Sequence, residues 1–178
     1  YQLGLIMQHI VVLNPKGGCG KTTIATHLAV YASTLGLRVA LADHDSQASS
    51  HDWIASRPRR CADIGTIAAY DGETFDGPAI DENYDVIVHD LPASVATDSF
   101  DLRRHCNKMV IPIMPSPIDI KAAMRLWTQL SENGILDEPG ITIGLVANRV
   151  KSNTKYAKVL DDFIERLGIP KVATLRDT

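Results

Sequence analysis

The sequence predicts an α/β fold in which a parallel sheet is covered by helices on both faces. Short segments rich in β-branched residues alternate with longer segments whose apolar residues recur at helical spacing. The short segments are apolar throughout, which is typical of strands buried on both faces of a parallel sheet. Gly36, Gly134 and Gly168 stand where a left-handed residue ends a helix. Such sheets bind ligands at the carboxyl ends of their strands, so the residues after each strand are the candidate functional residues.

The predicted elements follow one another along the whole chain. Strands are expected at 9–13, 38–42, 85–89, 108–114, 141–147 and 171–175. Helices are expected at 21–35, 47–56, 118–133 and 155–167. The segment 69–83, rich in glycine and aspartate, is expected to be a loop with one weak helix. No repeat, low-complexity tract or linker divides the chain, so a single domain over 1–178 is predicted.

Two of the predicted helices show an apolar face at helical spacing. In the helix 21–35 this face consists of Ile24, Leu28, Tyr31, Ala32 and Leu35. In the helix 155–167 it consists of Tyr156, Val159, Leu160, Phe163, Ile164 and Leu167. We expect both faces to pack against the sheet.

Composition excludes several protein classes. The 178 residues carry a net charge of −3, with 45% apolar and 22% charged residues, which is close to the average for globular domains. The longest apolar runs are too short for a membrane helix, and the N-terminus lacks the pattern of a signal peptide. Three cysteines without paired spacing argue against a disulfide framework or a four-cysteine zinc site, so a reduced cytoplasmic protein is predicted.

Charge is unevenly distributed along the chain. From Arg149 onward the balance is +3, whereas the residues before it have a balance of −6. This basic end permits contact with a polyanion, and Lys151, Lys155 and Lys158 are the candidate residues. Ordinary surface lysines explain the same excess, so charge alone leaves both interpretations open.

A glycine-rich loop between the first strand and the first helix predicts a phosphate site. The segment 14–23 reads Asn-Pro-Lys-Gly-Gly-Cys-Gly-Lys-Thr-Thr. Glycines let several backbone N–H groups point at one anion, and the helix N-terminus adds partial positive charge. Lys21 is placed to reach the β- and γ-phosphates of a nucleotide, and the Thr22 hydroxyl is placed to ligate Mg²⁺.

The segment from Lys16 to Thr23 resembles the deviant Walker A motif of the ParA/MinD family of P-loop ATPases. The resemblance implies ATP and Mg²⁺ as cofactors. It also implies that Lys16 reaches across an ATP-bound homodimer to the partner's phosphates, where it acts together with Lys21. The residues implied to bind the nucleotide here are Gly17, Gly18, Cys19, Gly20, Lys21, Thr22 and Thr23.

Two aspartates follow the second predicted strand. The segment from Asp43 to Ser49 resembles the family's Asp-x-Asp-Pro-Gln switch region, with Ser46 in the place of proline. The resemblance implies that Asp45 orients the attacking water and that Asp43 lies near the Mg²⁺ shell. Taken alone, two aspartates at this position also fit capping of the next helix. Loss of proline removes a fixed φ and is expected to loosen the loop.

Three later segments continue the resemblance in family order. Asp90 follows an apolar strand and matches the Walker B aspartate that holds Mg²⁺, with Ala93 replacing a proline. His89 beside it is expected to be a packed strand residue, because no second histidine lies at ligand spacing. The segment 112–119 resembles the family's Pro-x-x-Pro-Ser-Pro loop at the dimer face. Asn148 stands where the family places an asparagine that recognises the base, although a strand-end turn asparagine fits as well.

The resemblance covers 9–176, nearly the whole chain, and is strongest for the small partition ATPases without an N-terminal DNA-binding domain. Residues 1–6 are expected to be leader residues before Met7. Family members continue past the last strand into one or two helices. The resemblance therefore implies either a chain cut short at Thr178 or an unusually small member.

Three functions compete for this sequence. The first is a ParA-like ATPase that partitions DNA or positions another cargo. It dimerises with ATP, binds DNA nonspecifically at the nucleoid and is stimulated by a ParB-like partner. The second is a MinD-like membrane-positioning ATPase, which needs an amphipathic anchor that the helix 155–167 does not supply, because a strand follows it. The third is a P-loop synthetase or kinase-like enzyme, against which Lys16 counts.

Overall fold

The computed structural model describes residues 7–58, 60–69, 83–94 and 101–177. Its strands form one parallel sheet in the order β3-β2-β4-β1-β5-β6-β7, so the predicted α/β class is confirmed. The strands are β1 (Gln8–Val12), β2 (Val39–Asp43), β3 (Gly65–Ala68), β4 (Val86–Asp90), β5 (Lys108–Ile113), β6 (Thr142–Val150) and β7 (Lys171–Arg176). The helices are α1 (Lys21–Thr34), α2 (Ser49–Ala55), α4 (Leu102–His105), α5 (Pro117–Glu132) and α6 (Lys155–Leu167).

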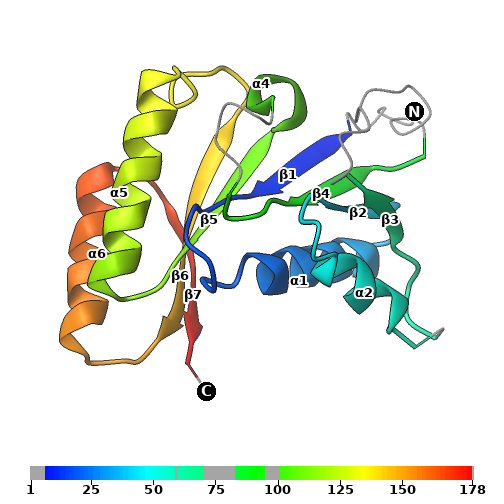
Figure 1. Ribbon diagram of the computed structural model, residues 1–178, viewed down its shortest axis with the longest axis horizontal. Coiled ribbons are helices and arrows are strands. Elements are labelled where there is room, and N and C mark those ends of the chain that lie inside the picture. The colour runs from blue at the N-terminus through cyan, green and yellow to red at the C-terminus, as the bar shows by residue number, and fades with distance from the viewer. Residues whose placement is uncertain (1–6, 59, 70–82, 95–100, 178) are drawn as a thin grey trace.

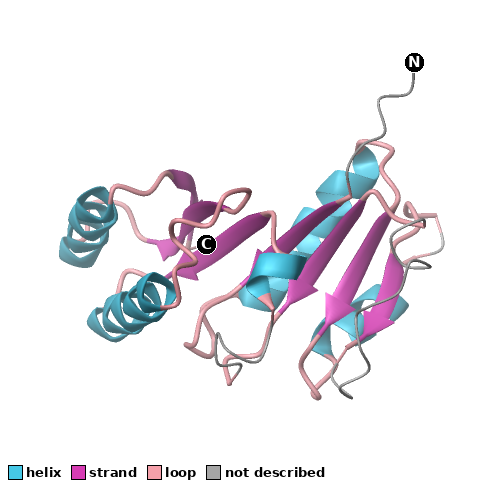
Figure 2. Cartoon of the chain, turned by 90° about the horizontal axis from the view of Figure 1, so that it is seen from above, coloured by secondary structure: helices cyan, strands magenta, loops and turns pink. Residues whose placement is uncertain are grey.

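Helices cover both faces of the sheet, as adjacent residues of β1 show. Successive strand residues point to opposite faces, so Val11 and Val12 belong to different layers. Val12 packs in the cluster that contains the buried residues of α1, and Val11 packs in the cluster that contains those of α5 and α6. Figure 1 shows α5 and α6 side by side, well away from α1 and α2, and Figure 2 shows the strands as a twisted sheet.

Two short elements escaped sequence prediction. The edge strand β3 has only four residues and alternates between half-buried and exposed positions, so it lacks the continuous apolar run of the inner strands. The helix α4 has four residues and one buried side chain, Leu102. The loop expected at 69–83 lies mostly at 70–82, outside the described residues, as do residues 1–6.

The apolar faces predicted for two helices are narrower in the structure. Tyr31 of α1 and its C-cap residue Leu35 are 64% and 60% exposed, whereas the buried apolar side chains of α1 are Ile24 and three alanines, Ala25, Ala29 and Ala32. In α6, Tyr156 and Val159 are 49% and 41% exposed, while Leu160 and Ile164 are buried. Periodicity therefore located both helices but overestimated the width of the face that the sheet covers.

The three cysteines are free thiols, with Cys19 and Cys106 buried and Cys61 exposed. Burial raises the pKa of the Cys106 thiol to about 12, which keeps this thiol protonated at neutral pH. No helix in the described part of the chain is both long enough and apolar enough to cross a membrane.

The strand register aligns the carboxyl ends of three central strands. Val12 pairs with Asp90, and Asp90 pairs with Asp43 on its other side. The ends of β1, β4 and β2 therefore lie next to one another at a single edge of the sheet. The candidate residues that follow these strands therefore lie at the carboxyl ends of the strands, where parallel sheets bind their ligands.

Candidate functional site

The glycine-rich loop leaves β1 and enters α1 through two left-handed residues. Gly18 and Gly20 have φ values of 76° and 93°, which side-chain-bearing residues rarely adopt. Cys19 between them is fully buried, and its thiol donates to the carbonyl of Lys16 at 3.2 Å. The Asn14 amide donates to the carbonyl of Pro112 at 2.6 Å and accepts from the Lys16 N–H at 2.8 Å. The loop is thus held in its curled shape by buried contacts.

The two lysines of this loop have different surroundings. Lys21 is only 8% exposed, and its ammonium donates to the carbonyl of Lys16 at 3.2 Å. The Lys16 ammonium lies in an exposed contact with the carbonyl of Gly17 at 3.3 Å. Lys21 therefore sits inside the curl of the loop, while the Lys16 side chain lies outside it.

A cavity of about 330 Å³ opens at this loop. Its wall includes most of the phosphate loop, Asp45 from the loop after β2, and Asp90 at the end of β4. The structure thus brings together residues from three separate predicted segments. Four predicted site residues do not line this cavity, namely Lys16, Cys19, Asp43 and Asn148. The lining residues are Gly17, Gly18, Gly20, Lys21, Thr22, Thr23, Asp45, Asp90, Leu91, Ala93 and Arg149.

Asp90 and Thr22 form the candidate magnesium site. Asp90 is 3% exposed, and burial raises the pKa of its carboxyl to about 6, while the hydrogen bond from the Thr22 side chain and the charge of Lys21 lower it. A carboxylate beside a hydroxyl at a phosphate site is a donor set that suits Mg²⁺. Burying the negative charge of Asp90 costs free energy, and a bound divalent cation would offset that cost.

Asp43 and Asp45 are two positions apart but lie in different surroundings. One carboxylate oxygen of Asp43 accepts the N–H groups of Ser50 and His51 at 3.0 Å each, and the other accepts the N–H of Asp45 at 3.0 Å. Asp43 is 1% exposed and therefore satisfies the N-terminus of α2. This arrangement favours the capping interpretation of Asp43 over the magnesium contact. Asp45 instead faces the cavity, half-buried, and accepts the N–H of Gln47 at 3.0 Å.

The loop 44–48 after β2, which we call the switch loop after the resemblance, begins with a half-buried histidine that continues into two buried ones. Nε2 of His44 lies 3.1 Å from Nδ1 of His89, and Nε2 of His89 lies 2.9 Å from Nδ1 of His9. Burial lowers the pKa of His44 to about 4 and, with the neighbouring histidines, lowers that of His89 well below its usual value. His89 is fully buried, which confirms that it is a packed strand residue. These contacts tie the loop after β2 to β4, which carries His89, and through it to β1, which carries His9.

Asn148 packs against the back of the phosphate loop. Its amide nitrogen donates to the carbonyl of Cys19 at 2.8 Å, and its carbonyl accepts the N–H of Arg149 at 2.9 Å. Each end of the amide thus contacts backbone, which holds the side chain against the phosphate loop and shows a positioning role for Asn148. A Cβ at Gly20 would lie 2.4 Å from the Asn148 nitrogen, so any larger residue at this position would displace the Asn148 side chain.

Arg149 is a cavity residue that sequence reasoning did not assign a role. It lines the same cavity as Lys21 and has a φ of 51°, which is uncommon for a residue with a side chain. Its position directly after Asn148, at the carboxyl end of an apolar strand, was the available signal. The positive charge of Arg149 adds to that of Lys21 at the candidate phosphate site.

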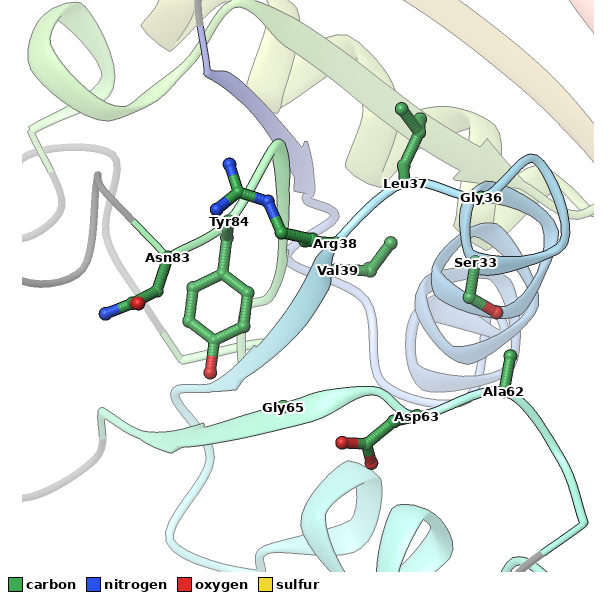
Figure 3. Close-up of a pocket in the computed structure, with 10 residues that line it drawn as sticks. All are labelled: Ser33, Gly36, Leu37, Arg38, Val39, Ala62, Asp63, Gly65, Asn83 and Tyr84. Carbon is green, nitrogen blue, oxygen red and sulfur yellow. The ribbon is translucent and has the colours of Figure 1, made fainter.

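A second cavity, of about 390 Å³, lies at the opposite end of the strands (Figure 3). Arg38, Asp63 and Tyr84 line it, and the Arg38 guanidinium is bound to Asp85 at 2.8 Å. The Tyr84 ring lies over Gly65, where a Cβ would come within 2.2 Å of its hydroxyl. Among the described residues that line this second cavity there is neither a glycine-rich loop nor a lysine, so the cavity at the phosphate loop is the better candidate for a phosphate site.

Residues 10–178 match the CobQ/CobB/MinD/ParA nucleotide binding domain. The chain belongs to this family. It is 30% identical over 169 residues to the maintenance of carboxysome distribution protein A of Halothiobacillus neapolitanus, covering 93% of this chain and 77% of that protein. It is 26% identical over 159 residues to the chromosome-partitioning ATPase Soj of Thermus thermophilus, covering 71% of this chain and 62% of Soj.

A solved structure shows the same fold. An ATP complex of a McdA variant from Cyanothece superimposes with a TM-score of 0.76 at 14% identity, covering 98% of this chain and 85% of that one. The P-loop ATPase fold predicted from the resemblance is therefore confirmed, and the chain is a ParA/MinD-like member of an ATPase family.

Proposed function

We propose that this chain is an ATP-dependent positioning switch, which dimerises around bound ATP and is reset by hydrolysis. The observation that carries the proposal is the division of charge at the phosphate loop. Lys21, Asp45 and Asp90 meet in one cavity, whereas Lys16 lies outside it. A lysine at that place supports a role toward the phosphates of a second copy, as the resemblance implies.

Within one copy, the phosphate loop supplies the ground-state contacts. Its backbone N–H groups and the Lys21 ammonium would hold the β- and γ-phosphates, with the N-terminus of α1 adding partial positive charge. Thr22 and Asp90 would hold Mg²⁺, Asp90 through a water molecule. When bound, the metal neutralises charge on the phosphate oxygens.

Asp45 is the residue proposed to position the attacking water. It lines the same cavity as Lys21 and is half-buried, so its carboxylate is available to accept a hydrogen bond from water in the cavity. It stands on the switch loop rather than on a strand. Its distance from the phosphate would therefore change with the loop, and a stimulating partner could act by moving the loop.

The cargo and the DNA contact are also proposals. The two named relatives are a carboxysome distribution protein and a chromosome-partitioning ATPase, which share a positioning role but differ in what they position. Lys155 and Lys158 are exposed on α6, whereas Lys151 pairs with Asp177 at 3.3 Å. We propose that the α6 lysines contact DNA when two copies are joined, which would place the protein at the nucleoid.

Dimerisation with ATP is the decisive test. Sedimentation velocity should show a dimer with ATP and a monomer with ADP. Lys21→Ala should lose nucleotide binding altogether, whereas Lys16→Ala should bind ATP as a monomer. Lys108→Ala, which changes an exposed lysine at the other end of the sheet, is the control and should dimerise normally. Dimerisation of Lys16→Ala with ATP would contradict the proposed role of Lys16.

Hydrolysis and DNA retention test the rest of the cycle. Asp45→Ala should keep the ATP dimer and lose phosphate release, so unchanged turnover would reject Asp45 as the water-positioning residue. Retention on DNA should require ATP and should fall steeply with salt, because phosphate contacts release counterions. Equal retention with ADP would contradict the switch.

A further inference from the structure

Two histidines stand directly before the two cavity aspartates, and their rings contact each other. His44 precedes Asp45 at the start of the switch loop, and His89 precedes Asp90 at the end of β4. Nε2 of His44 lies 3.1 Å from Nδ1 of His89, with ring centroids 5.3 Å apart. As far as the chain is described, the two aspartates line the nucleotide cavity and the two histidines do not. The contact between the rings therefore links the two cavity carboxylates from outside the cavity.

His89 is a fixed point within the sheet. It is fully buried on β4, which lies between β2 and β1. Its Nε2 lies 2.9 Å from Nδ1 of His9, and these two rings are stacked with centroids 5.1 Å apart. His9 is held through its backbone, because its N–H donates to the Asn107 side chain at 2.7 Å and its carbonyl accepts the Asn107 N–H at 2.9 Å. His44 is thus the end of the row of rings that reaches the loop.

The row favours one place for the His44 ring. Burial lowers the pKa of His44 and of His89, so both rings are neutral at pH 7. A neutral imidazole has one donor and one acceptor nitrogen, so His89 makes both ring contacts only when the donors point the same way along the row. If the His44 ring swung out, Nδ1 of His89 would lose the nitrogen that it faces, which is costly at a buried position.

The switch loop is a turn that is closed by its own backbone. The carbonyl of Asp45 accepts the N–H of Ala48 at 2.8 Å, and its carboxylate accepts the N–H of Gln47 at 3.0 Å. These bonds lie within the loop, so they define its shape but not its place against the sheet. The place of the turn depends on the residues at its start, where the ring of His44 contacts His89.

The Asp43 carboxylate is a second anchor, which acts on different segments. It accepts the N–H of Asp45 and two N–H groups of α2, so it joins the end of β2 to the loop and to the helix that follows. The contact of His44 with His89 instead joins the loop to β4, the strand that carries Asp90. It is the side-chain contact that relates the place of Asp45 to the candidate magnesium aspartate.

We propose that His44 is a positioning residue for hydrolysis, which sets the place of Asp45 relative to Asp90 through its contact with His89. The inference rests on the proposed function, in which Asp45 positions the attacking water. Without the contact, the phosphate loop would still hold the nucleotide, but the carboxylate of Asp45 would no longer be aligned. Misalignment by a fraction of an ångström slows a reaction without weakening the binding of its substrate. His44 therefore acts on turnover rather than on nucleotide affinity.

Three substitutions of His44 separate its hydrogen bond from its size. His44→Gln places an amide near the position of Nε2, and an amide can donate or accept, so the contact with His89 should survive. His44→Asn is one carbon shorter and should not reach His89, whereas His44→Phe fills the space without a ring nitrogen. We expect turnover within about threefold of the wild type for His44→Gln, and at least about tenfold lower turnover for His44→Asn and His44→Phe.

Turnover and affinity are measured separately on the full chain. Turnover is the rate of phosphate release at saturating ATP and Mg²⁺, and affinity is measured by titration with a non-hydrolysable ATP analogue. All three variants should bind the analogue within about twofold of the wild type. Thermal unfolding identifies the temperature at which every variant is folded, so lost stability is not mistaken for lost turnover. His27→Phe makes the same chemical change at an exposed position on α1 and should hydrolyse ATP normally.

Asp45→Ala, measured in parallel, separates the inference from the function on which it rests. If Asp45→Ala loses turnover while His44→Asn and His44→Phe keep it, the role of His44 is wrong and that of Asp45 stands. Equal losses in all three His44 variants, or a parallel loss of analogue affinity, would also overturn the role of His44. Full turnover in Asp45→Ala would reject the proposed function itself. Should His44→Phe not fold, the comparison of His44→Gln with His44→Asn still decides.

Discussion

The phosphate loop and the switch loop lie at the same edge of the sheet but are held in different ways. Between β1 and α1, the phosphate loop takes its shape from left-handed glycines, and Asn148 supports it from β6. The switch loop after β2 is held by side chains, namely the Asp43 carboxylate on backbone N–H groups and the imidazole of His44 against His89.

This difference fits the proposed division between a loop that binds phosphate and a loop that moves during the cycle. A backbone-built loop is preorganised for an anion and gains little from moving, because its N–H groups already converge. A loop held by a few side chains loses an anchor whenever one of those side chains is replaced or changes its partner. Ser46 in place of a proline adds backbone freedom to the second loop. Substitutions at the contacts that hold each loop should therefore affect stability, binding and hydrolysis in different proportions.

Gly20→Ala should have the largest effect. The new methyl would be placed 2.4 Å from the Asn148 nitrogen at a φ of 93°, so strain and overlap combine. A loss of about 3 to 5 kcal/mol in the free energy of unfolding and loss of nucleotide binding are expected. Chemical denaturation and nucleotide titration measure the two effects.

Gly36→Ala is the matched control for this substitution. Gly36 has a φ of 79°, but nothing lies within 4 Å of the place that a Cβ would take, so only backbone strain should appear. The expected loss is about 1 to 2 kcal/mol with normal nucleotide binding. Equal losses for the two variants would show that contact with Asn148 does not hold the phosphate loop.

Asp90→Asn should stabilise the nucleotide-free protein while abolishing magnesium-dependent hydrolysis. Burial raises the pKa of Asp90 to about 6, so its charge at pH 7 opposes folding. Removing that charge should raise the free energy of unfolding by up to about 3 kcal/mol, which corresponds to the rise of the Asp90 pKa from its ordinary value to about 6. Thermal unfolding at pH 7 and phosphate release are the measurements. A less stable variant that still hydrolyses ATP would contradict both assignments.

Asp43→Asn distinguishes a structural aspartate from a magnesium ligand. An amide has a single acceptor oxygen, so at least one backbone N–H group that the Asp43 carboxylate now accepts, in α2 or at Asp45, would lose its acceptor, and stability should fall by about 1 to 3 kcal/mol. The magnesium concentration that supports half-maximal hydrolysis should not change. A normal melting curve with a higher magnesium requirement would instead restore Asp43 to the metal shell.

His44 should give the smallest effect, as a pH dependence of stability. Burial holds the pKa of His44 near 4 in the folded protein, below the unfolded value of 6.5, so its contribution is present above pH 6.5 and is lost as pH falls toward 4. At pH 5.5 the loss should be about 1 kcal/mol. Because Asp90 has the opposite slope, the quantity to measure is the difference between the wild type and His44→Gln.

An exposed histidine on α1 provides the control for this pH measurement. His27→Gln replaces a histidine that is exposed to solvent, so it controls for the change of residue type in the same measurement. If His44→Gln has the same slope as the wild type, the imidazole of His44 does not hold the switch loop in a buried, neutral state.

Prediction from sequence succeeded where the signal was local. The helix at 155–167 was located to the residue, because its apolar stripe is bounded by a capping threonine and a left-handed glycine. The strand β3 was missed, since a four-residue edge strand has no continuous apolar run. The expected packing of Tyr31 against the sheet was wrong, because periodicity does not say how closely a helix lies to the sheet.

The candidate site divides in the same way. The shared location of the phosphate loop, Asp45 and Asp90 could be predicted, because each follows a buried strand and parallel strands end at one edge of the sheet. The contact of Asn148 with the carbonyl of Cys19 joins residues 129 positions apart, and no spacing rule predicts it. The hydrogen bonds from the N-terminus of α2 to the Asp43 carboxylate likewise depend on how that helix turns back after the loop.

The sequence by itself determined the class of fold, the phosphate loop and the order of the strands along the chain, because these depend on local periodicity, glycine conformations and strand ends. Only the tertiary structure decided which aspartate faces the cavity, what Asn148 supports, and that the side chain of His44 contacts His89. These outcomes depend on distances between segments remote in sequence, and only packing sets such distances.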